Sequence, residues 1–446
     1  MSDVLPKGWE HAEICAVCTL ENGRAFKPSE WTPSGLPIVR IQNLNNQKAT
    51  FNCYSGATQE KYSLKGGELL FAWSGTPGTS FGAHIWRGKN AVLNQHIFRV
   101  DFNDSAIEKR FFRYAINQKL GELIDVAHGG VGLRHVTKGV FEKTLVSVPP
   151  LPEQKRIADK LDALLARVDA CRERLDRVPK ILKRFRQSVL AAATSGELTR
   201  EWGTSAGDGT EWDQAVLGDL VQDGPKNGLY KQASSYGSGT RILRIDNFYD
   251  GFVRPWEELK RLEVTAKERL DYGLAVGDIV INRVNSLPYL GKAALIRDLP
   301  QECVFESNMM RIRLEAARVR SDYAILFLTS PAGIAQLRSN AKHAVNQASI
   351  NQTDVGNVSV PLPSLPEQAE IVRQVESLFA MADAIAACHE NASFSVNRLA
   401  PSSLAKAFCG ELVPQDPNDE PASELLARIR TQEAVTASAK PKRGNA

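Results

Sequence analysis

Two groups of polar side chains carry the clearest chemical signal in this 446-residue sequence, one in each half of the chain. Arginine, asparagine and glutamine can form paired hydrogen bonds with the edges of guanine and adenine, and lysine, serine and threonine suit phosphates. We therefore predict nucleic-acid contacts from both groups, although an ordinary solvated loop remains the simpler reading of any single residue. The predicted contacts are Arg40, Gln42, Asn43, Asn45, Trp73, Ser74, Thr76, Thr79, Asn94, Gln95, His96, Arg134 and His135 in the first half, and Arg244, Asn247, Asn282, Arg283, Asn285, Ser286, Tyr289, Lys292, Asn308, Asn346, Gln347 and Asn351 in the second.

Motifs for catalysis and for metal binding are missing from the sequence. Cys15-x-x-Cys18 has no second pair at zinc-finger spacing, and its alternation with apolar residues is more typical of a strand. The glycine-rich segment Gly75–Gly82 lacks the Gly-Lys-Ser/Thr of a phosphate loop, and His128–His135 lacks the strand–helix context of a dinucleotide site. The Asp/Asn-Pro-Pro-aromatic motif of amino-methyltransferases is also missing. We expect no catalytic residue, metal or cofactor in this chain.

Composition and charge describe an ordinary globular protein of two to four domains. The chain is 43% hydrophobic and 24% charged, with a net charge of +4, so nucleic acid is a permitted partner and not a required one. Seven scattered cysteines favour reduced thiols. No apolar stretch reaches the roughly 18 residues of a membrane helix, and the first residues do not resemble a signal peptide. We expect a cytoplasmic protein without a membrane partner.

Short apolar runs and helical segments alternate in both halves, which predicts an α+β fold for each. Gly67–Trp73 and Gly277–Val284 read as buried strands that follow a glycine–acid turn. Arg110–Ala127 and Ser321–Arg338 read as helices. These elements would have to place the polar groups on the surface of each domain.

The two halves follow one plan, because the tetrapeptide Leu-Pro-Glu-Gln occurs at residues 151–154 and again at 365–368. The register stays free of gaps, at an offset of 214 residues, from there to a shared Gly-Glu-Leu at 196–198 and 410–412. Before the tetrapeptides the match is looser: "IVRIQN" at 38–43 pairs with "ILRIDN" at 242–247, offset by 204. The chain therefore reads as a variable domain, a similar segment, a second variable domain and a second similar segment.

The similar segments carry the heptad pattern of long coiled-coil helices. In the first, Leu161, Val168 and Leu182 continue one side of the seam, and Pro179 should kink or break the helix. The second seam is weaker, and Pro401 interrupts it near its end. Net charges of +4 for residues 151–202 and −3 for 365–412 favour pairing of these two helices with each other. The alternative is two unrelated amphipathic helices, each packed on its own domain.

Pro149–Thr199 and Leu365–Leu412 resemble the central and C-terminal conserved regions of the specificity subunits of type I restriction–modification systems. The resemblance implies two target recognition domains, at 1–148 and 203–362, each reading one half of a split double-stranded DNA site. It implies that the conserved regions, 149–202 and 363–413, pair as antiparallel helices about a pseudo-two-fold axis. Two modification subunits with S-adenosylmethionine and two restriction subunits with ATP and Mg²⁺ would join, and this chain would catalyse nothing.

Further expectations concern the helices and the end of the chain. If the paired helices act as a ruler, their length sets the unread gap between the half-sites. Residues 414–446 are expected to form a polar tail with one short helix at Ser423–Ala434 and a disordered end. Two rival interpretations are a coiled-coil adaptor without DNA specificity and a nuclease or methyltransferase with a diverged site.

Overall fold

The computed structural model describes residues 5–46, 49–75, 81–126, 134–202, 212–249, 251–253, 255–345 and 347–438. These residues belong to two compact units. The first unit combines residues 1–174 with 392–446, and the second consists of residues 175–391. Each unit holds one α+β domain and two helical segments. In the first unit these are α5 (Leu151–Leu175), up to residue 174, and the C-terminal part of α12 (Leu365–Phe408). In the second unit they are α6 (Val178–Ala193) and the N-terminal part of α12.

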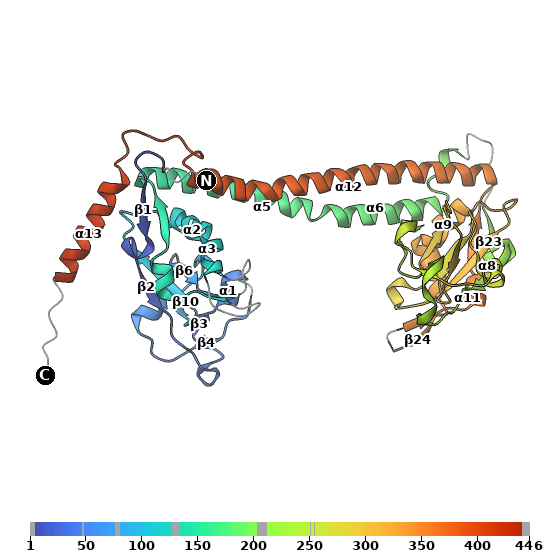
Figure 1. Ribbon diagram of the computed structural model, residues 1–446, viewed down its shortest axis with the longest axis horizontal. Coiled ribbons are helices and arrows are strands. Elements are labelled where there is room, and N and C mark those ends of the chain that lie inside the picture. The colour runs from blue at the N-terminus through green and yellow to red at the C-terminus, as the bar shows by residue number, and fades with distance from the viewer. Residues whose placement is uncertain are drawn as a thin grey trace. The chain divides into compact units, whose positions relative to one another are not determined.

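A four-stranded antiparallel sheet in the order β2-β10-β6-β8 forms the centre of the first unit. All residues of its strand β6 are buried, as the apolar run in the sequence predicted. Helices α2 and α3 lie next to this sheet (Figure 1). The elements are β2 (Cys18–Asn22), β10 (Ile97–Phe102), β6 (Leu69–Ala72), β8 (Gly82–Ile85), α2 (Lys109–Gln118) and α3 (Leu120–Asp125).

Smaller elements complete the first domain. A second sheet has the order β4-β3-β9-β5, with β3 parallel to β9, and two further strand pairs are β1–β12 and β7–β11. These elements are β4 (Cys53–Tyr54), β3 (Leu36–Val39), β9 (Ala91–Leu93), β5 (Ser63–Leu64), β1 (Glu10–Glu13), β12 (Leu145–Val148), β7 (Ser74–Gly75), β11 (Arg134–His135), α1 (Ile41–Asn45) and α4 (Lys138–Glu142).

The second unit repeats this architecture. Its central sheet has the order β14-β23-β19-β21, and its parallel pair β15–β22 corresponds to β3–β9. The elements are β14 (Val221–Asn227), β23 (Met309–Leu314), β19 (Ile279–Asn282), β21 (Ala293–Leu295), β18 (Arg261–Leu262), β15 (Tyr236–Leu243), β22 (Cys303–Phe305), β13 (Asp213–Val216), β26 (Ser359–Leu362), β16 (Phe248–Tyr249), β17 (Phe252–Val253), β20 (Val284–Asn285), β25 (Gln347–Ser349), β24 (Lys342–Ala344), α8 (Ala266–Tyr272), α9 (Ser321–Thr329), α10 (Pro331–Arg338) and α11 (Gln352–Gly356). The predicted α+β fold with an internal repeat is confirmed.

The two predicted domain helices each divide into two. In the first domain, α2 ends at Gln118 and α3 begins at Leu120. In the second, Ser330 separates α9 from α10, and its hydroxyl accepts a hydrogen bond from the amide of Gly333. Pro331 takes the first position of α10, where a missing N–H costs nothing.

Proline has opposite effects in the two similar segments. The predicted break at Pro179 is confirmed, since α5 ends at Leu175 and α6 begins at Val178. The prediction for Pro401 is wrong, because α12 continues through it to Phe408. Pro401 is exposed, so its ring faces water, and the packed face of the helix holds the backbone in place despite one lost hydrogen bond.

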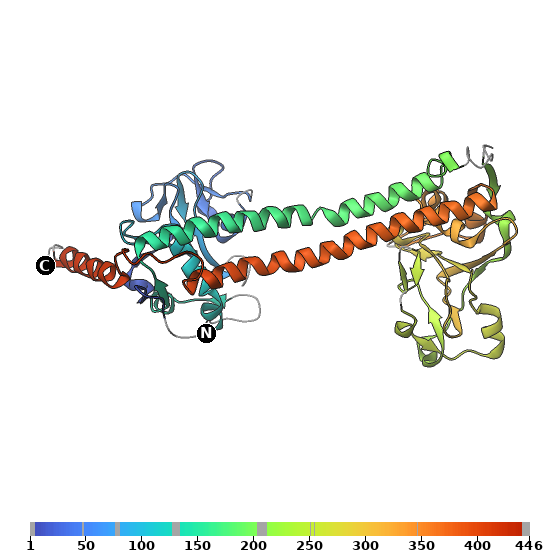
Figure 2. The same cartoon turned by 90° about the horizontal axis from the view of Figure 1, so that it is seen from above.

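Within each unit the helices pair antiparallel, as predicted (Figure 1; Figure 2). In the second unit, Arg186 of α6 forms an ion pair with Asp383 of α12, and Nε2 of His389 donates to the carbonyl oxygen of Leu175 at 3.0 Å. In the first unit, Nε of Arg172 donates to Oδ1 of Asn397 at 3.2 Å. The ion pair between Arg186 and Asp383 joins the basic segment to the acidic one, as their net charges suggested.

The end of the chain is not the polar tail expected. Helix α13 (Ala422–Ser438) is longer than predicted, and its residues Ala422, Leu425, Leu426 and Ile429 are buried in the core of the first unit. The amide of Ala422 donates to the carbonyl oxygen of Gly8 at 2.9 Å. The expectation of a disordered end concerns residues 439–446, which lie outside the described residues.

The paired cysteines near the start do not form a metal site. Cys15 is exposed in a 3-10 turn, Ile14–Ala16, and Cys18 is buried at the start of β2, so the two thiols lie in different environments. Within the described part of the chain, no group of three potential metal ligands comes together. In the same part, no helix is long and apolar enough to cross a membrane.

Candidate nucleic-acid interface

The tetrapeptide at the start of α5 fastens the first domain to its helix. Nε1 of Trp9 donates to Oε2 of Glu153 at 3.1 Å, within the buried interior. Oε1 of Gln154 accepts from the amide of Glu108, the residue before α2, at 2.9 Å. Nε2 of Gln154 donates to the carbonyl oxygen of Pro149 at 2.9 Å. We call these contacts the latch of the first unit.

The second tetrapeptide makes the same latch in the second unit. Nε1 of Trp212 donates to Oε2 of Glu367 at 3.1 Å, and Oγ1 of Thr199 donates to Oε1 of the same carboxylate at 2.7 Å. Gln368, which is fully buried, accepts from the amide of Arg320 at 2.8 Å and donates to a proline carbonyl oxygen at 2.9 Å. The sequence repeat therefore encodes a structural joint, and the residues that could read a ligand lie elsewhere in each domain.

A matching turn occurs at "IVRIQN" and "ILRIDN". The carboxamide of Asn43 accepts from the amide of Arg40 at 3.1 Å, and Asn247 accepts from the amide of Arg244 at 3.0 Å. Asn43 is fully buried, so its side chain serves the turn. On the same turn, the side chains of Gln42 and Asn45 are exposed and can face a ligand.

Aromatic and imidazole rings gather in the first domain where β7 pairs with β11. The ring of Trp73 lies 5.3 Å from that of His96 and 5.9 Å from that of His135. The pairing of β7 with β11 sets Ser74 opposite His135, which is exposed. Together with Gln95, beside His96 in the chain, we call Trp73, His96 and His135 the imidazole cluster.

The imidazole cluster holds polar atoms that are not satisfied within the described part of the protein. Nε1 of Trp73, Oε1 of Gln95 and Nδ1 of His96 are buried and have no hydrogen-bond partner there. Burial lowers the pKa of His96, and the nearby His135 and Arg40 lower it further. These effects favour the neutral form of the His96 ring. An indole donor, a carboxamide acceptor and an imidazole nitrogen, all without partners among the described residues and close to an exposed histidine, suit the edge of a nucleobase.

The same junction in the second domain carries a guanidinium. Arg283 occupies the position of Trp73, since the amide of Ile350 bonds to its carbonyl as that of Val136 bonds to Trp73. Nη1 of Arg283 donates to the carbonyl oxygen of Ser307 at 3.1 Å, and its Nε is buried without a partner among the described residues. The two domains thus present chemically different groups from one strand junction.

Other predicted residues of the second domain have mainly local contacts. Nζ of Lys292 donates to the carbonyl oxygen of Ile245 at 2.8 Å and lies 3.9 Å from the centre of the Tyr249 ring. Asn351 caps α11 by accepting from the amide of Asp354 at 3.0 Å. Half-buried or exposed positions that can face a ligand are Asn285, Ser286, Tyr289, Asn308 and Gln347.

Some predicted contacts are buried or lie outside the described residues. Ser74 and Asn94 are buried in the first domain, and Asn282 is fully buried in β19. Thr76, Thr79 and Asn346 fall outside the described residues, as does the side chain of Arg134. The contacts predicted from the sequence did not include His84, Arg87 and Arg113, which line a pocket beside α1. Gly67 and Gly277, which precede the matching strands, differ by 210 residues, as do Arg87 and Arg297, but this match marks a shared position and gives no sign of the pocket.

The family model described as the type I restriction modification DNA specificity domain matches residues 6–180 and 211–392. The chain belongs to this family. The first match takes in one domain and all of α5, and the second takes in the other domain and α12 as far as residue 392. The expectation that the chain is a specificity subunit, and not one of the catalytic subunits of such a system, is therefore confirmed.

Whole-length relatives agree with this family. The chain is 33% identical to the type I restriction enzyme EcoBI specificity subunit of Escherichia coli, over 98% of this chain and 94% of the relative. It is 32% identical to the StySPI specificity subunit of Salmonella potsdam, over 99% of each chain. The HsdS subunit from Thermoanaerobacter tengcongensis shares the fold with a TM-score of 0.57 at 19% identity, over 92% of this chain and 98% of that one. A chain from a structure of a type I R-M system gives a TM-score of 0.70 at 19% identity, over 92% of this chain and all of that one.

Proposed function

We propose that this chain is the DNA-reading subunit of a type I restriction–modification complex. Each domain reads one half of a split target in double-stranded DNA, and the chain itself catalyses no reaction. The observation that carries the proposal is the double match of the specificity family, once to each repeat. The imidazole cluster in one domain and Arg283 in the other give the two repeats different chemistry at one position, as the two halves of an asymmetric target require.

The partners that we propose are two modification subunits, which carry S-adenosylmethionine, and two restriction subunits, which use ATP and Mg²⁺. Exposed apolar side chains on the paired helices support a protein partner there, because water-exposed groups of this size gain from burial. These are Ile181, Met381, Ile385, Phe394 and Leu399, of which Phe394 is 65% exposed. The proposed place of action is the cytoplasm, which holds the DNA of prokaryotic cells.

The helices are proposed to set the gap between the half-sites. Removing one heptad from each helix, Leu161–Arg167 and its counterpart Val375–Met381, keeps the seam in phase and shortens the pair. The expected result is a target with a changed gap, or no binding. An unchanged gap with unchanged affinity would rule out the ruler.

A map of methylated adenines tests the function. Genomic DNA from cells with and without this chain is compared, in a host that carries the modification subunits. A split motif that disappears on deletion supports the proposal. Methylation that stays the same refutes it and favours the rival adaptor, which would bind proteins without any sequence preference on DNA. Methylation or cleavage by the purified chain alone would favour the rival enzyme.

A further inference from the structure

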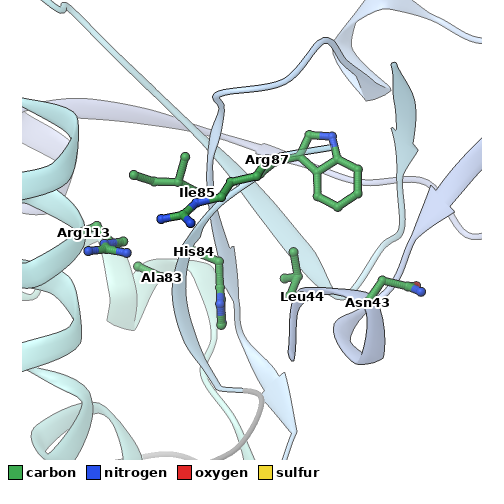
Figure 3. Close-up of a pocket in the computed structure, with 8 residues that line it drawn as sticks. Asn43, Leu44, Ala83, His84, Ile85, Arg87 and Arg113 are labelled. Atoms are coloured by element: carbon green, nitrogen blue, oxygen red, sulfur yellow. The ribbon is translucent and has the colours of Figure 1, made fainter. Parts of the chain in front are cut away.

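A pocket of about 170 Å³ opens in the first unit between α1, β8 and α2 (Figure 3). Asn43 and Leu44 of α1 form one wall. His84 of β8, Arg87 just beyond that strand and Arg113 of α2 also line it, and the described lining includes no acidic residue. In Figure 3 the Arg87 side chain extends from its strand toward the side on which Arg113 lies.

The two guanidinium groups differ in how they are held. Arg87 is exposed and forms no ion pair with any residue that the structure describes. Arg113 lies over the ring of Tyr114 at 4.3 Å, and its Nη2 lies 3.5 Å from Oδ1 of Asp162. Nη1 of Arg110 lies 3.1 Å from Oδ2 of the same carboxylate, so two arginines share the negative charge of Asp162. The buried Nε of Arg113 has no partner among the described residues, and the pocket keeps a positive surplus.

The second domain does not repeat the lining of this pocket. β8 and β21 pair with equivalent strands in the same register, Ile85 with Leu69 and Leu295 with Ile279, so Arg87 corresponds to Arg297. The same register sets His84 against Ala294. The latch amides of Glu108 and Arg320 are 212 residues apart, which sets Arg113 against Ile325. Ala294 and Ile325 are both almost fully buried. The guanidinium of Arg297 lies over the ring of Phe252 at 5.1 Å. Arg297 also lines a larger pocket of about 720 Å³ with Lys183 and Arg186, but Asp322, Glu376 and Asp383 line the same pocket. A basic lining without an acidic residue, among the residues described, is therefore a feature of the first-domain pocket.

We infer that this pocket binds one phosphate group of the DNA backbone. The inference rests on the proposed function and adds a contact to it. Guanidinium groups bind phosphate oxygens through paired, charge-assisted hydrogen bonds, which the surplus positive charge favours. The pocket, at about 170 Å³, is smaller than the roughly 300 Å³ at which small-molecule sites begin, so it suits a phosphate and not a whole nucleotide.

The position of α1 connects the pocket with the base-reading residues. Asn43 and Leu44 of this short helix line the pocket. Arg40, immediately before the helix, is close enough to His96 to lower the pKa of that histidine. A phosphate held in the pocket would therefore lie beside the helix that carries the exposed Gln42. Phosphate contacts of this kind fix the register of a protein on DNA, and the base contacts then select the sequence.

The test measures DNA affinity of the complex with modification subunits across a salt titration. The Arg87→Gln variant should weaken binding equally for all DNA sequences, with the methylated motif unchanged. The slope of log K against log salt should fall by about 0.9, the value for one phosphate contact. Arg297→Gln is the matched control, and it should leave the slope unchanged because Asp322, Glu376 and Asp383 line its pocket and disfavour a phosphate there. DNA in which single phosphates are replaced by neutral methylphosphonates should then reveal the contact. At one position the replacement should weaken binding by the wild type and have no effect on binding by Arg87→Gln.

Several outcomes would overturn the inference. These are an unchanged slope in Arg87→Gln, an equal fall in Arg297→Gln, or a changed motif in place of a changed slope. If no methylphosphonate position behaves as described, while inorganic phosphate at fixed ionic strength stabilises the wild type and not Arg87→Gln, the pocket binds a free anion and the DNA assignment is wrong. A wild-type complex without sequence-selective binding would instead refute the proposed function.

Discussion

Replacing Gln368 with methionine tests whether the latch holds the second domain to α12. Gln368 is fully buried, and methionine has nearly its length but no hydrogen-bonding amide. The substitution leaves the amide of Arg320 and the carbonyl oxygen of Pro363 without their partners, which lie at 2.8 and 2.9 Å in the structure. A third bond, to the carbonyl oxygen of Arg318, is long at 3.3 Å and contributes less.

The expected loss follows from the two short hydrogen bonds. A buried group that loses its partner costs about 1–3 kcal/mol, so the free energy of unfolding of the second unit should fall by about 3 kcal/mol. Because about 1.4 kcal/mol corresponds to a factor of ten, amide exchange in α9 should accelerate by about a hundredfold. Helix α2 of the first unit, held by Gln154, should exchange at its original rate.

Hydrogen exchange followed by mass spectrometry reports both units in one sample. Gln154→Met is the reciprocal variant, and it should accelerate exchange in α2 and not in α9. Gln187→Met, on the exposed face of α6, is the matched control and should change stability by less than about 0.5 kcal/mol. The reasoning is refuted if Gln368→Met resembles this control, or if it loosens both units alike.

Three further substitutions test the burial of Glu153, the docking of α13 and the imidazole cluster. Burial raises the pKa of Glu153 above its ordinary value, although the Trp9 indole and Arg156 act in the opposite direction. The contribution of Glu153 to the stability of the first unit should therefore be most favourable below the unfolded pKa of about 4.3, and it should be lost as the pH rises through the folded pKa. Glu153→Gln should flatten this part of a plot of melting temperature against pH, and an unchanged plot would contradict the assignment. Leu425→Ala in α13 should cost the first unit about 2–5 kcal/mol in urea unfolding, because the leucine is only 1% exposed, whereas Arg430→Ala on the exposed face should have little effect. Trp73→Phe keeps the ring and removes the Nε1 donor, so it should relax base preference in one half of the methylated motif by about 1–3 kcal/mol per contacted base; a change in both halves would argue against a local contact.

Periodicity and repetition were sufficient to predict the main elements from the sequence. The buried strands at Gly67–Trp73 and Gly277–Val284, the break at Pro179 and the antiparallel pairing all follow from local patterns and from charge. The helix at Ser423–Ala434 was predicted, but its packing into the core of the first unit was not, because its apolar residues are few and the surface they contact is not revealed by any local pattern. Pro401 was misjudged for the same reason, since tertiary packing and an exposed position outweighed a local propensity.

The candidate interface was less accessible to sequence reasoning. Asparagine suits adenine edges, but it also suits turns and helix caps. Asn43, Asn247 and Asn351 make the local contacts, and only the observed hydrogen bonds separate the two roles. The matched spacing of Arg40 to Asn43 and Arg244 to Asn247 was a hint of a shared turn. The basic pocket could not be predicted, because Arg87 and Arg113 come from different elements.

The latch makes few demands on the domain that it holds. The glutamate and the glutamine belong to the helices. Each domain contributes mainly one tryptophan side chain together with backbone amide and carbonyl groups. Any amino acid other than proline supplies such an amide. A domain with an entirely different reading surface could therefore be exchanged onto the same helix, provided that it keeps the tryptophan and the backbone course at the joint. Target specificity can change by substitution of whole domains while the framework that assembles the complex is inherited intact.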